Sequence, residues 1–204
     1  MKNLSYPKIR EQMCEVARQI WGRRLTTSYG GSFAARAGEF SFLVTPSLLA
    51  EEKHFQLFHE NLFHVSLDGK VLEGTGRLSR ETDILANILR SFPTVGAVIL
   101  AHPLNCMVFA AAGKAIPSVT EATARQGSAG LSKPAEKGTP EMTANILAHF
   151  SARRLLLEDG LPLGCVVPKY GVVVTGKDIY KAFTMLELTE TDAYCALNLP
   201  KLNG

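Results

Sequence analysis

The sequence lacks the features that mark several large classes of protein. None of its apolar stretches approaches the roughly 18 residues that a membrane-spanning helix needs. Residues 1–10 do not form the apolar core of a signal peptide. Lys and Arg outnumber Asp and Glu by only 22 to 19, and the basic residues form no stripe or run. We therefore expect a cytoplasmic protein that has neither a membrane nor a nucleic acid as its partner.

Cysteine pairs and phosphate-loop motifs are also missing. The four cysteines lie far apart, without a CxxC pair, at Cys14, Cys106, Cys165 and Cys195. In a chain of 204 residues this spacing favours reduced thiols over a disulfide framework. The glycine-rich segment 74–77 (Gly-Thr-Gly-Arg) lacks the Gly-Lys-Thr/Ser ending of a phosphate loop. Apolar residues nevertheless make up 46% of the sequence, which is enough for a full hydrophobic core.

The spacing of apolar residues predicts an α/β protein. Helical periodicity covers about residues 6–22, 79–92, 140–151 and 178–197, and Pro103 opens a further helix that reaches about residue 112. Extended runs predict strands at Phe33–Arg36, Phe40–Thr45, Asn61–Leu67, Val71–Glu73, Val95–Ala101, Leu163–Val167 and Val172–Thr175. The stretch 126–139 is rich in Gly, Ser, Pro and Lys, which predicts a long loop. Because no repeat or linker divides the chain, we predict a single domain over residues 1–204.

His102 has the most informative position among the five histidines. It follows the predicted buried strand and precedes Pro103, at a strand-to-helix junction. Since side chains alternate along a strand, His102 and Leu100 are expected on the same face. Two histidines there would form half of a metal site, but leucine offers no donor atom. His102 and Cys106 are one helical turn apart and could share a metal, although the same positions fit a structural histidine and a packed cysteine.

Other polar residues could transfer a proton or bind an anion. Glu81 lies near the start of a predicted helix that Ser79 would cap, where the helix dipole favours the ionised carboxylate. The same position would let Glu81 act as a general acid or base. Groups that could cradle an anion, and that also fit ordinary turns and caps, come from Gly31, Ser32, Thr45, Ser79 and Arg80.

The order of these segments over the whole chain resembles the class II aldolase/adducin family, which includes fuculose-phosphate aldolase and ribulose-phosphate 4-epimerase. The family pattern runs from a Gly-Asn-x-Ser-like loop through a Thr-Pro turn and a Pro-Ser-Ser-Glu-like helix start. It ends with a His-x-His strand end and a late His-Gly. The matching segments here are Gly31-Ser32-Phe33-Ala34, Val44-Thr45-Pro46-Ser47, Leu78-Ser79-Arg80-Glu81, Leu100-Ala101-His102-Pro103 and Tyr170-Gly171.

The resemblance implies a three-layer α/β sandwich with a central, largely antiparallel sheet flanked by helices. It also implies a homotetramer with sites between subunits, and a divalent metal, commonly zinc, held by three histidines beside a catalytic glutamate. Here Glu81 takes the glutamate position and His102 one ligand position, whereas Leu100 and Tyr170 occupy the other two. Glu121 falls near the position where a neighbouring subunit supplies an acid or a tyrosine in some members.

These departures leave three functions open. The first is a C–C lyase acting on a small, phosphorylated hydroxy-carbonyl compound, with Glu81 as acid/base and His102 as metal ligand or oxyanion donor. The second is a non-catalytic module, like the adducin head, that binds a small anionic sugar or a protein partner. The third is a metal-independent isomerase or epimerase that uses Glu81, His102, Tyr170 and Glu121. A zinc site made of His102, Tyr170 and Glu81 would have one good nitrogen donor, whereas three good nitrogen or sulfur donors are the norm.

Overall fold

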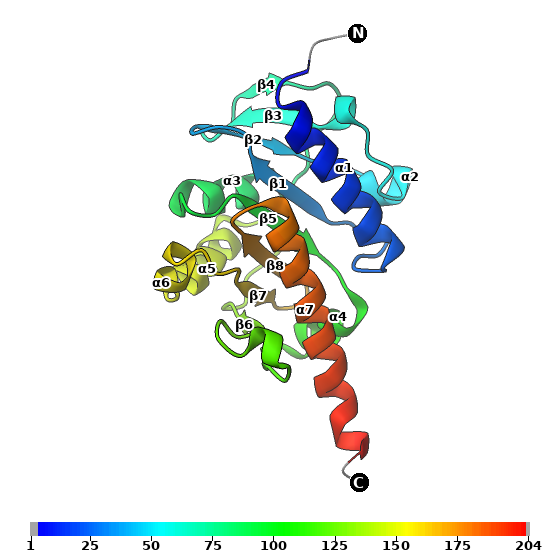
Figure 1. Ribbon diagram of the computed structural model, residues 1–204, viewed down its shortest axis with the longest axis vertical. Helices are drawn as coiled ribbons and strands as arrows, with labels where there is room; N and C mark the ends of the chain where they lie inside the picture. The colour runs from blue at the N-terminus through cyan, green and yellow to red at the C-terminus, as the bar shows by residue number, and fades with distance from the viewer. Residues whose placement is uncertain (1–3, 203–204) are drawn as a thin grey trace.

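The computed structural model describes residues 4–202 and contains one eight-stranded sheet with helices packed against it (Figure 1). Along the sheet the strands follow the order β4-β3-β2-β1-β5-β8-β7-β6. Neighbouring strands pair antiparallel, except that β6 and β7 are parallel. The strands are β1 (Ser32–Arg36), β2 (Ser41–Val44), β3 (Phe63–Ser66), β4 (Val71–Glu73), β5 (Ala97–Ala101), β6 (Ala129–Leu131), β7 (Gly164–Val167) and β8 (Gly171–Gly176).

Helices cover both faces of this sheet. The α-helices are α1 (Pro7–Gly22), α2 (Leu49–Lys53), α3 (Thr82–Ser91), α4 (Leu104–Ala112), α5 (Pro140–Ser151), α6 (Arg154–Glu158) and α7 (Ile179–Asn198). Apolar side chains of α1, α2, α4 and α7 form one core with one face of the sheet, and those of α3, α5 and α6 form a second core with the other face. Figure 1 shows α1 and α7 lying along the same side. The predicted three-layer sandwich with a largely antiparallel sheet is therefore confirmed.

The central strands β1, β5 and β8 lie side by side, and the start of β1, the end of β5 and the start of β8 meet at the same end of the sheet. In β5, the run Ala-Val-Ile-Leu-Ala is buried on both faces, which is why it is continuously apolar. Ser32 of β1 pairs with Leu100 of β5, and Ala101 pairs with Val172 of β8. The residues just beyond these pairs are Gly31, His102 and Gly171. The register thus gathers three of the segments that carry the sequence motifs.

Two local predictions were wrong. The stretch 126–139 is not a continuous loop, because it contains β6, which forms an edge strand beside β7. Ser79 is not the cap of α3, which begins at Thr82. Instead, Ser79 forms a turn in which its carbonyl oxygen accepts a hydrogen bond of 2.7 Å from the Thr82 hydroxyl. The short helices α2 and α6 and the 3-10 turns η1 (His59–Asn61), η2 (Glu121–Thr123) and η3 (Leu199–Leu202) were not predicted.

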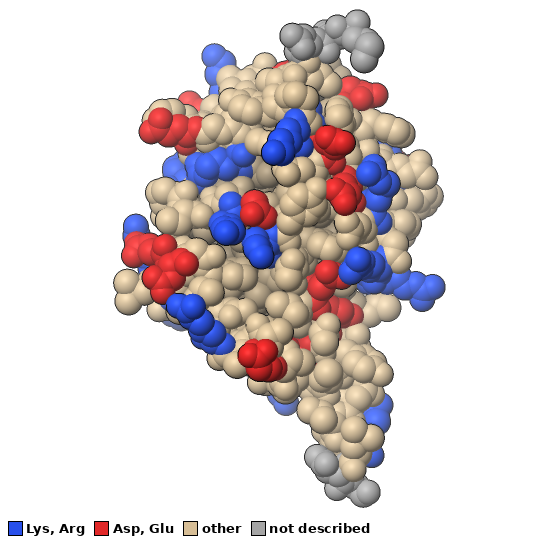
Figure 2. Space-filling view, viewed as in Figure 1, with Lys and Arg blue, Asp and Glu red and all other residues tan. Residues whose placement is uncertain are grey.

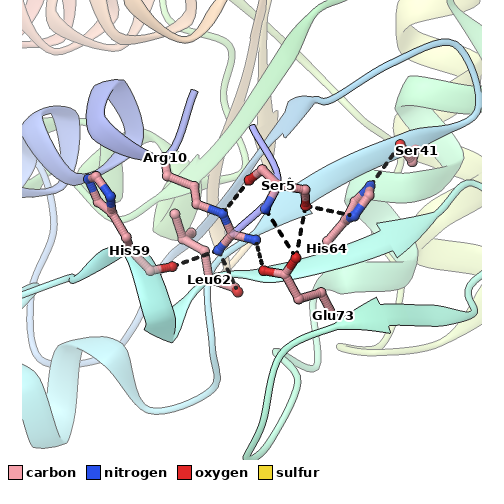
Figure 3. Close-up of polar contacts among 7 residues, drawn as sticks. All are labelled: Ser5, Arg10, Ser41, His59, Leu62, His64 and Glu73. Atoms are coloured by element: carbon pink, nitrogen blue, oxygen red, sulfur yellow. Dashed lines mark hydrogen bonds and ion pairs between the residues drawn. The ribbon is translucent and has the colours of Figure 1, made fainter. Parts of the chain in front are cut away.

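A fully buried arginine fastens α1 to the hairpin of β3 and β4 (Figure 3). The Arg10 guanidinium donates hydrogen bonds to the carbonyl oxygens of Ser5 at 2.7 Å, His59 at 2.6 Å and Leu62 at 3.1 Å. It also forms an ion pair with Glu73. Burial of a charged group is costly unless it is paired and hydrogen-bonded, and here each requirement is met.

One face of the molecule agrees with the mixed charge of the sequence. On the face seen in Figure 2, Lys and Arg side chains lie among Asp and Glu side chains and gather in no patch of one sign. Among residues 4–202, no helix is long and apolar enough to cross a membrane.

Candidate functional site

The half-buried carboxylate of Glu81 forms the centre of a hydrogen-bonded group. Tyr170, just before β8, donates a hydrogen bond of 2.8 Å to Oε1, and the Ser79 hydroxyl donates one of 2.6 Å to Oε2. Burial raises the pKa of Glu81, but these two hydrogen bonds and the positive charge of Lys137 outweigh it, so the pKa lies below its ordinary value. Glu81 is therefore an anion near neutral pH.

Tyr170 is a hydrogen-bond donor in this group. Its side chain packs into the core that α3, α5 and α6 form with the sheet, and the residue is 5% exposed. Burial, together with the neighbouring Glu81 carboxylate, raises the pKa of the phenol far above its ordinary value. The phenol consequently keeps its proton throughout the physiological pH range, so that it can donate a hydrogen bond but is a poor metal ligand.

The imidazole of His102 lies next to this pair and is 2% exposed. It contacts the rings of Tyr29 and Tyr170 edge-on, with centroid distances of 5.0 and 5.5 Å. Nδ1 lies 3.1 Å from the carbonyl oxygen of Gly30, which can only accept, so Nδ1 carries the proton. Burial lowers the pKa of His102, and the ring is neutral. Nε2 is therefore a lone-pair acceptor, and it has no hydrogen-bond partner among the described residues.

Glycine at position 171 allows β8 to begin beside this histidine. A Cβ there would lie 2.6 Å from the Ala101 carbonyl oxygen and 2.9 Å from His102 Cδ2, which is too close for any side chain. Gly171 thus lets the chain pass close to His102, and the ring of Tyr170, the residue before it, contacts the imidazole. Leu100 packs into the same core as Tyr170.

A small pocket opens over Glu81. Of the predicted site residues, Gly31, Ser79, Arg80 and Glu81 line it, and the lining also includes Tyr29 and Lys137. Ser32 and Thr45 do not line it, since both are fully buried and their hydroxyls bond to each other over 2.9 Å. Thr45 Oγ1 also accepts a hydrogen bond of 3.2 Å from the Phe33 N–H. In this structure the two hydroxyls connect β1 to the end of β2.

Glu121 lies apart from this pocket in the same chain. It begins the 3-10 turn η2 and is exposed. Asp192 of α7, fully buried, anchors this turn by accepting hydrogen bonds from Thr120 N at 3.0 Å and from the Thr123 hydroxyl at 2.5 Å. The position that the resemblance gave for Glu121 was in the site of a neighbouring subunit.

Tyr29 and Lys137 are among the pocket residues that the sequence motifs did not predict. Lys137 Nζ lies 4.7 Å from the centroid of the Tyr29 ring and 4.8 Å from that of Tyr170. Tyr29 precedes the glycine pair 30–31, so its position beside that loop was a usable signal. Lys137 carried no such signal, because a lysine in a polar stretch is most often solvated.

The sequence of this chain matches a known family model. Residues 11–197 match the model described as Class II Aldolase and Adducin N-terminal domain. This match spans most of the chain, which therefore belongs to the class II aldolase and adducin family. The resemblance inferred from the motif order is confirmed.

Individual relatives agree with this assignment. The chain is 26% identical over 179 residues to the 5-methylthioribulose-1-phosphate/5-deoxyribulose-1-phosphate aldolase of Rhodospirillum rubrum, a match that covers 87% of this chain and 75% of the relative. An L-fuculose 1-phosphate aldolase structure matches with a TM-score of 0.80 at 17% identity, covering 100% of this chain and 92% of the other. The L-fuculose-1-phosphate aldolase from Thermus thermophilus has a TM-score of 0.77 at 18% identity, with 97% and 96% covered. At such identities the structural likeness establishes the fold alone.

Proposed function

We propose that this chain is a lyase that cleaves a C–C bond in a small phosphorylated hydroxy-carbonyl compound by proton transfer through Glu81, with Tyr170 as a hydrogen-bond donor. The observation that carries the proposal is the 2.8 Å hydrogen bond from the Tyr170 phenol to the carboxylate of Glu81, a residue that lines the pocket. One group is an anion and the other keeps its proton, which provides a base and a donor side by side. Arg80 at the pocket rim suits a phosphate group.

The proposed chemistry begins when a substrate hydroxyl replaces Tyr170 as the hydrogen-bond donor to Glu81. Losing the Tyr170 hydrogen bond raises the proton affinity of the Glu81 carboxylate, which then takes the hydroxyl proton. The C–C bond breaks, one fragment leaves as an aldehyde, and the electron pair forms an enolate on the other fragment. Tyr170 donates a hydrogen bond to the enolate oxygen, and Glu81 returns its proton to the enolate carbon.

We assign no step to a divalent metal such as zinc, because the donor atoms do not fit one. Leu100 offers only carbon, and Tyr170 is a protonated phenol. His102 Nε2 is thus the one good donor at the three family ligand positions, whereas zinc sites use three or four protein ligands. Among the described residues, no three or more His, Cys, Asp or Glu side chains gather where they could hold a metal ion.

One observation favours a second candidate, a module that binds a small anionic sugar without converting it. Tyr29 contacts His102, and the imidazole is almost entirely buried, so a ligand reaches it only if Tyr29 moves. The isomerase or epimerase alternative uses the same groups, Glu81 and Tyr170. Product analysis distinguishes the three functions, since cleavage alone releases an aldehyde.

The test is an assay of aldehyde release from a panel of phosphorylated ketoses, with EDTA and with zinc, manganese or cobalt restored. We expect cleavage in EDTA, and Glu81→Gln should lower kcat by about 10²- to 10⁴-fold because the base is lost. Glu39→Gln, which changes an exposed carboxylate away from the pocket, is the matched control and should retain activity. Activity that returns only with added metal would contradict the proposal, and ligand binding without any turnover would support the second candidate.

We also propose the homotetramer that the family implies. On α4, Leu104 and Val108 lie one turn apart and are 58% and 50% exposed, which suits burial against another subunit. Glu121 is exposed outside its own pocket, as expected for a residue that serves a neighbouring site. Sedimentation should give a mass of about four chains, and Leu104→Glu with Val108→Glu should lower it. A monomer in the unmodified protein would contradict this.

A further inference from the structure

Lys137 brings a positive charge to the pocket without an acidic partner. Its ammonium group lies within cation–π distance of the Tyr29 and Tyr170 rings and donates a hydrogen bond of 3.3 Å to the Tyr29 hydroxyl. The ion pairs among residues 4–202 do not include Lys137. The two tyrosine rings and the Tyr29 hydroxyl hold the Lys137 ammonium in place without neutralising it, so it can bind an anion.

The start of α5 determines where Lys137 lies. Gly138 follows it with φ +76°, a left-handed conformation that favours glycine. Thr139 then caps α5, since its hydroxyl accepts a hydrogen bond of 3.3 Å from Met142 N and donates one of 2.7 Å to the Glu136 carbonyl oxygen. The backbone of Lys137 is therefore held beside the hydrogen-bonded start of α5, although its side chain is exposed.

The charge of Lys137 acts on Glu81 and His102, two titratable groups of the site. It is among the causes that lower the pKa of Glu81, and it also lowers the pKa of His102. Lys137 and Glu81 line the same pocket but come from different segments of the chain. Lys137 lies in the β6–α5 connection, and Glu81 lies just before α3. A bound carbonyl compound would therefore lie between a base and a cation.

We propose that the Lys137 ammonium is a catalytic group that binds the oxyanion formed on the substrate, in the role that a metal ion has in the family. This inference rests on the proposed function and names the positively charged group that stabilises the enolate in that reaction. When the C–C bond breaks, its electron pair moves into the enolate and negative charge develops on the former carbonyl oxygen. Lys137 donates a hydrogen bond to this oxygen and keeps its proton, so no co-reactant is needed.

Binding of two anions to metal-free protein tests the inference without requiring turnover. One probe is 2-phosphoglycolate, whose carboxylate imitates the enolate charge, and the other is inorganic phosphate. By calorimetry, Lys137→Met should weaken 2-phosphoglycolate binding by about tenfold or more and leave phosphate binding unchanged. Lys137→Arg, which keeps the charge, should restore most of the affinity. Lys133→Met, at an exposed lysine of the same segment, should behave like the unmodified protein.

Each other outcome overturns the inference in a recognisable way. Equal weakening of both probes would make Lys137 a phosphate ligand. Unchanged 2-phosphoglycolate binding in Lys137→Met would exclude Lys137 from the oxyanion site, while the Glu81→Gln assay would still decide the proposed function. If the unmodified protein bound neither probe, the inference would fail, and the aldehyde-release assay would decide the proposed function separately.

Discussion

The polar cluster around Arg10 and the cluster at the candidate site each contain a histidine whose pKa is lowered mainly by burial. In the first cluster, His64 uses both ring nitrogens, with Nδ1 3.2 Å from Ser5 Oγ and Nε2 2.9 Å from Ser41 Oγ (Figure 3). In the second cluster, His102 bonds through Nδ1 alone.

This difference separates a structural cluster from a candidate site. Buried polar atoms in folded proteins nearly always have a partner, because an unpaired one costs about 1–3 kcal/mol. The Arg10 cluster meets this rule and holds α1 in place. The site cluster breaks it at His102 Nε2, which is the behaviour expected where a ligand can supply the missing partner.

The largest expected effect on stability is from breaking the paired cluster. Arg10→Met should lower the free energy of unfolding by about 3 kcal/mol, because it leaves Glu73 and three carbonyl oxygens without their donor. Urea unfolding followed by circular dichroism measures this loss. Arg18→Met, at an exposed arginine of the same helix, is the control and should change little. A loss as small as that of the control would mean that the buried cluster contributes little net stability.

A smaller effect should appear in the pH dependence of stability. Both histidines have folded pKa values below the ordinary 6.5, so the unfolded chain takes up protons first as the pH falls. The stability is thus complete above about pH 6.5 and decreases below it. His102 should contribute more of this decrease, because protonated Nε2 would find no acceptor, whereas His64 has serine hydroxyls and Glu73 nearby.

The matching measurement compares urea midpoints at about pH 7.5 and about pH 5.5 for two variants. His102→Asn should flatten the decrease by about 1 kcal/mol, and His64→Asn should flatten it less. Equal slopes in both variants would show that the pairing of the ring nitrogens does not govern the titration.

Much of the fold was predictable because the apolar pattern is local. The run Val95–Ala101 contains β5, and the periodic stretch 178–197 matches α7 within a residue. β6 escaped prediction, since Ala129-Gly130-Leu131 has no β-branched residue and is a strand only through pairing with the distant β7. The start of α3 was misplaced because the Ser79 hydroxyl bonds to Glu81 in a turn before the helix.

The sequence by itself determined the family and the identity of Glu81, His102 and Tyr170 as candidates, because their motifs occur in a set order along the chain. Only the tertiary structure decided which of their atoms are paired. It joined Tyr170 to Glu81 across 89 positions of sequence and left His102 Nε2 unpaired. It also brought the ammonium of Lys137 to Tyr29, across 108 positions. Such contacts depend on strand register and helix packing, which no local pattern of residues encodes.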